Sequence, residues 1–223
     1  MSPESRARDC APDEACPHTL LRVAGPGALV SAVTPPPWVR ESLERAPWVV
    51  VRRAGPRDGW LPVGVRGPLR QQRFAAWLAG ADVLACVTPE GLARRRPWTD
   101  RSRAARLPAL AALDQVGAIL RAHRLGSSWG PAGSVGFELA SGCPTVTEQS
   151  DLDLVVHVAT PMAAAPAASL LSALCKLAVR ADLLLETPRG AVALAEYARA
   201  SGPVLLRTPD GPRLVVPSSL LEA

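Results

Sequence analysis

The feature that most constrains the fold is a glycine-serine pair followed, after a polar stretch, by two aspartates at alternate positions. Gly133-Ser134 opens a largely apolar segment that predicts a short helix, and Asp151 and Asp153 stand in the sequence SDLDLVV. Alternate residues of a strand share one face, so a strand over 150–158 places both carboxylates on one side and its leucines on the other. The order of helix, loop and strand predicts an α/β fold for this part of the chain.

The same residues predict a site for a metal ion and for phosphate groups. Two carboxylates on one strand face repel each other, and Mg²⁺ relieves that repulsion while joining carboxylates to substrate phosphates. The helix start at Gly133 supplies backbone N–H groups, and Ser134 supplies a hydroxyl, for binding an anion. The alternative is an acidic strand end that faces solvent beside an ordinary turn. That alternative is the better one for an isolated Asp-x-Asp, but the full order of elements favours the site.

This arrangement resembles the nucleotidyltransferase superfamily, whose active site is a Gly-Ser pair, two aspartates on the next strand and a third carboxylate on a later strand. The resemblance implies Asp182 as the third carboxylate, on a strand predicted over 181–186 behind a helix predicted over about 163–179. Glu186 would share its strand face, but Asp182 is the better match. Sixteen residues lie between Ser134 and Asp151, more than in compact members, which predicts a longer loop from Cys143 to Gln149.

Within that superfamily the chain is most similar to malonate decarboxylase holo-[acyl-carrier-protein] synthase, also called phosphoribosyl-dephospho-CoA transferase. The resemblance runs from about His18 to Val216 and is carried by the segments WGPAGSVGFEL (129–139), SDLDL (150–154) and PVGVRG (62–67), with Arg70 and Arg73.

We therefore expect three parts in the chain. A nucleotidyltransferase domain over 108–223, with a mixed sheet and flanking helices, follows a smaller basic α+β domain over 18–107. Residues 1–17 are expected to be a flexible tail.

The resemblance implies a transferase. The resemblance implies that such a transferase takes 2'-(5''-triphosphoribosyl)-3'-dephospho-CoA and places the phosphoribosyl-dephospho-CoA group on a serine of the apo acyl carrier protein of malonate decarboxylase, releasing pyrophosphate. The carboxylates expected to bind Mg²⁺ and to carry catalysis are Asp151, Asp153 and Asp182. The residues expected to bind substrate are Gly133, Ser134, Arg66 and Arg70.

Two other functions remain open. A nucleotidyltransferase that uses an ordinary nucleoside triphosphate would keep the same three aspartates. A non-catalytic protein would instead capture the carrier or the CoA precursor through its arginines, and intact aspartates argue against it.

Charge is divided unevenly along the chain, although the net charge is only +5. Residues 1–107 hold 17 arginines and 10 acidic residues, whereas residues 108–223 hold 8 basic and 10 acidic residues. Arginine pairs well with phosphate and carboxylate, so Arg52, Arg53, Arg66, Arg70 and Arg73 are candidates for contacting the substrate or an acidic carrier. A solvated basic surface without a dedicated ligand is the equal alternative. Arginines and aromatic residues are too little interleaved to favour nucleic acid.

The cysteines and the hydropathy pattern predict a cytoplasmic protein that does not bind membranes. The five cysteines form no CxxC pair and indicate no disulfide framework, and the first residues lack an apolar signal segment. The longest uncharged stretch, 154–175, contains a histidine and two prolines, which favours a strand, a turn and a helix over a membrane span.

Local patterns predict the remaining elements. They are a hairpin over 48–53 and 60–66, a helix over 71–78, a strand over 81–87, helices over 108–121 and 190–200, and a closing hairpin over 203–207 and 213–216.

Overall fold

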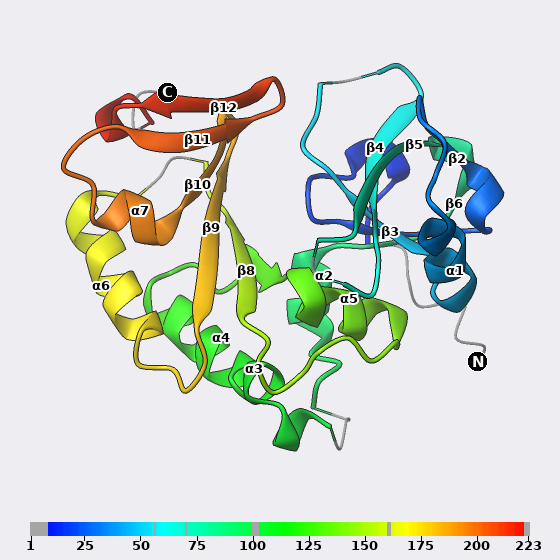
Figure 1. Cartoon of the computed structure of the whole chain (residues 1–223). Helices are drawn as coiled ribbons and strands as arrows, with labels where there is room; N and C mark the ends of the chain where they lie inside the picture. Colours follow the sequence, from blue (N-terminus) through cyan, green and yellow to red (C-terminus); the bar gives the residue numbers. More distant parts are fainter. Residues whose placement is uncertain (1–8, 56, 70, 100–102, 160–161, 221–223) are drawn as a thin grey trace. The chain divides into compact units, whose positions relative to one another are not determined.

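The computed structural model describes residues 9–55, 57–69, 71–99, 103–159 and 162–220, and Figure 1 shows their elements. The chain divides into two compact units, the first ending at Thr88 and the second beginning at Pro89. Each unit contains a six-stranded sheet and its own helices. The expected α/β class with two domains is confirmed.

The first unit is built on an antiparallel sheet with the strand order β2-β5-β4-β3-β1-β6. Helix α1 (Pro37–Arg45) begins at the last of three consecutive prolines. Proline fits the first helical position because the backbone N–H there needs no helical partner. Val39 and Leu43, one turn apart on α1, are buried in the same apolar cluster as the inward side chains of the sheet. The strands are β1 (Leu20–Val23), β2 (Leu29–Val30), β3 (Trp48–Val51), β4 (Trp60–Arg66), β5 (Arg73–Ala79) and β6 (Val83–Val87). Short 3₁₀ turns are η2 (Pro12–Glu14), η3 (Pro26–Ala28) and η4 (Gly80–Asp82).

The helix predicted over 71–78 is wrong, because this segment forms strand β5. Phe74, Ala76 and Leu78 are buried while the residues between them are more exposed, which is the two-residue period of a strand. β5 also pairs with β4 over seven consecutive residues, from Trp60 with Ala79 to Arg66 with Arg73. Alternation and strand pairing therefore decide the structure of this segment.

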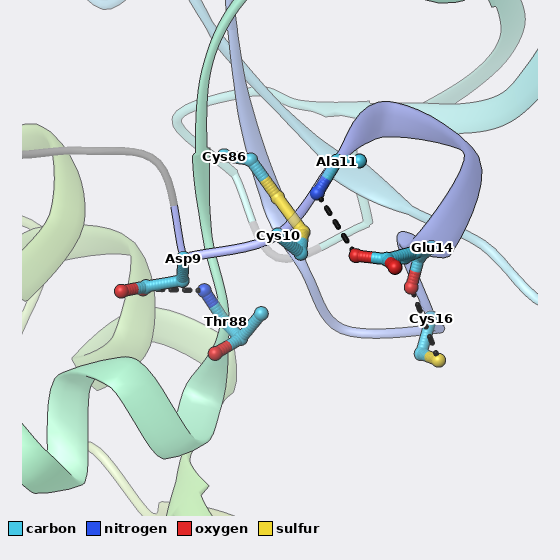
Figure 2. Close-up of a disulfide and its surroundings, with 7 residues drawn as sticks. All are labelled: Asp9, Cys10, Ala11, Glu14, Cys16, Cys86 and Thr88. Carbon is cyan, nitrogen blue, oxygen red and sulfur yellow. Dashed lines mark hydrogen bonds between the residues drawn. A yellow bond between two sulfur atoms is a disulfide. The ribbon is translucent and has the colours of Figure 1, made fainter.

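The expected flexible tail is attached to the first unit from Asp9 onward. Cys10 forms a disulfide with Cys86 of β6, a pairing that the sequence analysis did not indicate (Figure 2). Beside the disulfide, the Asp9 N–H donates to the Cys86 carbonyl oxygen at 2.9 Å. The Asp9 carboxylate accepts the Thr88 N–H at 3.1 Å (Figure 2). Residues 1–8 of the expected tail lie outside the described residues.

The second unit is built on a mixed sheet with the strand order β12-β11-β10-β9-β8-β7. β8 and β9 are parallel and are connected through α6, which Figure 1 shows in yellow, and the other neighbouring strands are antiparallel. The strands are β7 (Trp129–Pro131), β8 (Leu152–His157), β9 (Ala181–Thr187), β10 (Gly190–Ala193), β11 (Val204–Thr208) and β12 (Gly211–Val215). The helices are α2 (Pro89–Arg95), α3 (Pro108–Ala111), α4 (Leu113–Ala122), α5 (Gly133–Ser141), α6 (Ala164–Leu174) and α7 (Leu194–Ala198), with 3₁₀ turns η5 (Ala104–Arg106) and η6 (Pro217–Leu220).

The helix predicted over 190–200 is replaced by strand β10 followed by the short helix α7. Ala191 and Val192 are fully buried, and β10 pairs along its whole length with β9. Hydrogen bonding to the neighbouring strand therefore overrides the helix propensity of an alanine-rich segment.

The division between the units falls at Thr88 and Pro89 rather than at the expected Leu107 and Pro108. Contacts of the second unit explain the difference. Helix α2 packs against β7 and α5, and a Cβ on Gly130 would lie 1.9 Å from the carbonyl of Pro89. The buried indole of Trp98 donates to Asp114 of α4 at 2.8 Å. Glu90 of α2 contacts His157 at the end of β8, with 2.5 Å between Oε1 and Nδ1.

In the part of the chain that the structure describes, no helix combines the length and the apolar character needed to cross a bilayer.

Candidate functional site

Asp153 and Asp182 lie directly opposite each other on the parallel strands β8 and β9. The register pairs Leu152 with Ala181 and Asp153 with Asp182. Paired residues of neighbouring strands point to the same face, and neighbouring strands are about 4.8 Å apart. The structure therefore makes neighbours of two of the three predicted carboxylates.

Asp151 stands one residue ahead of β8. The first residue of the strand, Leu152, donates its N–H to the Arg180 carbonyl oxygen at 2.9 Å, which attaches the start of β8 to the residue before β9. Leu152 and Leu154 are buried, whereas Asp153 is exposed and Asp151 is half-buried. The predicted alternation is confirmed from Leu152 to Leu154, whereas Asp151, which was predicted to lie on the strand, precedes it.

The start of helix α5 lies against the Asp153 carboxylate. Gly133 has a φ of +55°, and a Cβ at this position would stand 1.8 Å from Asp153 Oδ2. The preceding residue, Ala132, donates its N–H to the Asp153 carbonyl oxygen at 2.9 Å. Only glycine allows both the left-handed backbone and this close approach. The glycine that begins the sequence motif is thus beside the second aspartate of the pair.

Ser134 is the first residue after this glycine and is 7% exposed. Its carbonyl oxygen accepts the hydroxyl of Thr145 at 3.0 Å, which connects α5 to the loop that leads to Asp151. The first N–H groups of a helix have no partner within the helix, so the start of α5 can bind an anion beside the carboxylates. This helix start and the aspartates are therefore placed for a ligand that carries both phosphate and metal.

Asp182 forms an ion pair with Arg180, the residue just before β9. The Arg180 guanidinium contacts both carboxylate oxygens, with Nε and Nη2 each 3.2 Å from one of them. The side chains of Arg180 and Asp182 are 72% and 43% exposed. Exposed ion pairs contribute little free energy, so this pair is weak enough for a metal or a phosphate group to replace.

The fit of Mg²⁺ to this site rests on the chemistry of the donors. Mg²⁺ is usually bound through one or two carboxylates together with substrate phosphates and water. Asp151 and Asp153 supply hard oxygen donors of this kind. Across the described ranges of the chain, no three His, Cys, Asp or Glu side chains are grouped as a metal centre made only of protein ligands would require. The donor set fits a metal held jointly by protein and substrate.

Glu138 is a buried acid that the sequence analysis did not single out. It lies on α5, and its side chain is only 1% exposed. Burial by itself would raise the pKa of this carboxyl, but hydrogen bonds from the backbone N–H groups of Val146 and Thr145, with Arg103, hold the pKa below its usual value. Glu138 is therefore ionised at neutral pH. The sequence signal was one charged residue within an otherwise apolar helix.

The predicted arginines belong to the first unit. Arg66 is half-buried at the end of β4, and the strand register places it opposite Arg73 of β5. Arg52 donates its Nε–H to the Val63 carbonyl oxygen at 2.8 Å and so has a structural partner within the sheet. Arg70 lies outside the described residues.

Comparison with protein families matches both units of the chain. Residues 92–218 match the family model described as the phosphoribosyl-dephospho-CoA transferase MdcG C-terminal domain. Residues 16–89 match the model described as the N-terminal domain of the same transferase. The junction of the two matches agrees with the division seen in the structure.

Curated proteins named phosphoribosyl-dephospho-CoA transferase are similar over most of their length. The protein of Azotobacter vinelandii is 43% identical over 200 residues, which cover 89% of this chain and 92% of that protein. That of Pseudomonas putida strain GB-1 is 42% identical over 203 residues, with the same coverage. That of Klebsiella pneumoniae strain 342 is 36% identical over 198 residues, covering 89% and 93%. No solved structure matches the chain.

Proposed function

The chain belongs to the phosphoribosyl-dephospho-CoA transferase family and is a transferase, and on this premise we propose its full reaction. The donor is 2'-(5''-triphosphoribosyl)-3'-dephospho-CoA, and the acceptor is a serine of the apo acyl carrier protein of malonate decarboxylase. The serine oxygen forms a bond to the phosphorus nearest the ribose. The bond from that phosphorus to the oxygen it shares with the next phosphorus breaks, and the two outer phosphates leave as pyrophosphate.

The observation that carries this proposal is the position of Asp153. It faces Asp182 across the parallel strand pair and lies against the start of α5 at Gly133. Phosphoryl transfer depends mainly on positioning the phosphates and on offsetting charge on the leaving group. A carboxylate pair beside a helix start provides both functions at one place.

The roles of the residues follow from these positions. Asp151 and Asp153 would hold Mg²⁺ together with the substrate phosphates, and Asp182, which is paired with Asp153, would accept the proton of the incoming serine. The backbone of Gly133 and the Ser134 residue orient the terminal phosphates. The chemistry that bound Mg²⁺ would supply there is the offsetting of negative charge on the phosphates and on the leaving pyrophosphate.

We propose that arginines of the first unit bind anionic groups. Residues 1–107 carry seven more arginines than acidic residues. We assign Arg66 and Arg70 to the phosphates of the donor or to an acidic face of the carrier, because arginine pairs with both groups.

The proposed location is the cytoplasm. Disulfides are rare in this reducing compartment, so the Cys10–Cys86 disulfide of the structure would form only under oxidising conditions.

The experiment is a single incubation of the full chain with apo carrier protein, the triphosphoribosyl donor and Mg²⁺, read by the intact mass of the carrier. We expect the carrier to gain the mass of phosphoribosyl-dephospho-CoA and pyrophosphate to accumulate in equal amount. The D153N variant should lose this transfer. The matched control is D210N, in the exposed turn between β11 and β12, which should modify the carrier at the wild-type rate.

Each alternative function gives a different mass. A plain nucleotide on the acceptor, formed from an ordinary nucleoside triphosphate, would replace the proposal by general nucleotidyl transfer. An unmodified carrier without pyrophosphate would indicate a binding protein. Wild-type transfer by D153N would contradict the assigned site while leaving the reaction standing.

A further inference from the structure

We propose that Glu138 is a positioning residue, which holds the loop of residues 142–149 on helix α5 and thereby sets the place of Asp151. The inference rests on the proposed function, in which Asp151 is a catalytic carboxylate. Glu138 itself lies on α5 and is buried, and in this assignment it acts through the loop and not on the substrate.

The centre of the loop is held from two sides. Glu138 Oε2 accepts the backbone N–H groups of Thr145 and Val146, each at 2.8 Å. Glu138 Oε1 accepts the Nε–H of Arg103 at 3.2 Å, and Arg103 Nη2 donates to the Val146 carbonyl oxygen at 3.1 Å. One carboxylate and one guanidinium thus bind both the N–H and the C=O of the same loop residue, and the Val146 side chain is buried.

The loop is also joined to the start of the helix. The Thr145 hydroxyl donates to the Ser134 carbonyl oxygen at 3.0 Å. Ser134 and Glu138 are four residues apart, so they lie on the same side of α5, one turn from each other. The loop therefore follows the helix turn that carries the proposed phosphate site.

Little free chain separates this attachment from Asp151. Thr147 and Ser150 close a turn, in which the Ser150 N–H donates to the Thr147 carbonyl oxygen at 3.1 Å and the Thr147 N–H donates to the Ser150 hydroxyl at 3.0 Å. Asp151 follows at once, and Leu152 is already hydrogen-bonded to Arg180. Asp151 is consequently held between the Glu138 attachment and the start of β8.

An ionised glutamate suits this position better than a neutral residue. A carboxylate has only acceptor sites and can accept three hydrogen bonds at once. A glutamine amide has one oxygen and one NH₂ group, and the NH₂ group would face another donor and form no hydrogen bond with it. A glutamine can keep its oxygen on the two backbone N–H groups, but its amide nitrogen then faces Arg103. Replacement by leucine removes all three acceptor contacts.

The experiment compares E138Q and E138L with the control E148Q, which changes an exposed glutamate of the same loop. Amide hydrogen exchange over 142–151 should be about 10-fold faster in E138L, because buried hydrogen bonds of the loop are lost. Displacement of Asp151 should lower kcat/KM about 100-fold in E138L and less in E138Q. E148Q should match the wild type in both measurements.

The Mg²⁺ dependence of transfer distinguishes the positioning role of Glu138 from a role limited to folding. If Glu138 positions Asp151, E138L should need several-fold more Mg²⁺ for half-maximal transfer and should bind Mn²⁺, followed by electron paramagnetic resonance, several-fold more weakly. A partly unfolded enzyme would lose kcat with unchanged metal dependence, which would overturn the proposal, as would unchanged hydrogen exchange in E138L. If the wild type transfers nothing, the proposed function fails. Amide hydrogen exchange and Mn²⁺ binding, which do not depend on transfer, then still decide the role of Glu138.

Discussion

Gly133 and Asp153 approach each other so closely that a Cβ on the glycine would stand 1.8 Å from the aspartate Oδ2. The start of α5 and the end of the Asp-x-Asp pair are therefore parts of one arrangement, although 19 residues separate them in the sequence. A ligand that binds the aspartates also meets the backbone of the helix start.

The first prediction is that G133A displaces the Asp153 carboxylate. The added methyl group cannot share space with Oδ2, so the aspartate must leave its place, and the rate of transfer should fall about 100-fold. The measurement is the initial rate of carrier modification, followed by intact mass.

The control for this prediction is G142A at the other end of the same helix. Gly142 also has a positive φ, +77°, but a Cβ there would meet nothing within 4 Å. Both variants should lose about 1 kcal/mol of stability from the left-handed backbone. An equal loss of activity in the two variants would show that backbone strain, rather than contact with Asp153, explains the effect.

The second prediction concerns metal removal. Like charges opposite each other destabilise a sheet, and Asp153 and Asp182 are such a pair. Mg²⁺ should therefore raise the unfolding temperature of the wild type by a few degrees relative to EDTA. D153N should be more stable than the wild type in EDTA and should respond little to Mg²⁺. Calorimetry checks this at matched ionic strength, and a Mg²⁺ response preserved in D153N would contradict it.

The alternation of Asp153 with buried leucines could be predicted because it depends on short-range periodicity. The choice of Asp182 came from the resemblance to nucleotidyltransferases, and the parallel pairing of β8 and β9 places it opposite Asp153. The attachment of Glu138 to Thr145 and Val146 depends on how a loop folds back on a helix. No local pattern encodes that contact, and only an isolated charge in an apolar helix hinted at it.

The domain division and the disulfide could not be predicted for the same reason. Trp98 belongs to the second unit because its indole reaches Asp114, and this contact depends on tertiary packing. Cys10 and Cys86 are 76 residues apart, so their pairing follows from the position of the N-terminal segment beside β6. The helix predicted over 71–78 failed because pairing with β4 overrides local propensity.

The third prediction concerns acid stability. Hydrogen bonds from Trp98 and then Arg96 hold the pKa of Asp114 below its usual value of 3.8. A carboxyl with a lowered pKa in the folded state stabilises the fold above its unfolded pKa, and this contribution disappears as the pH falls through the folded pKa. The wild type should therefore exceed D114N in stability at pH 7, and the difference should be smaller at about pH 3, below the unfolded pKa. Urea unfolding at the two pH values tests this, and an equal difference at both would refute it.

The fourth prediction is that reduction of the Cys10–Cys86 disulfide destabilises the first unit and leaves the second unit unchanged. The bond spans 76 residues, all within the first unit, so it restricts the unfolded chain of that unit alone. The expected loss in C86S is about 4 kcal/mol in the loop-entropy description.

Hydrogen exchange measured separately for peptides of the two units tests this. Peptides from 9–17 and from β6 should exchange faster in C86S, or in wild type treated with dithiothreitol, than in the untreated wild type. Peptides from β8 and β9 should not change, because no described hydrogen bond of those strands depends on Cys86. C175S is the matched control, since it removes an exposed thiol from the second unit and should alter neither set. Equal acceleration in both units would mean that the disulfide stabilises the whole chain, and the two units would then unfold together.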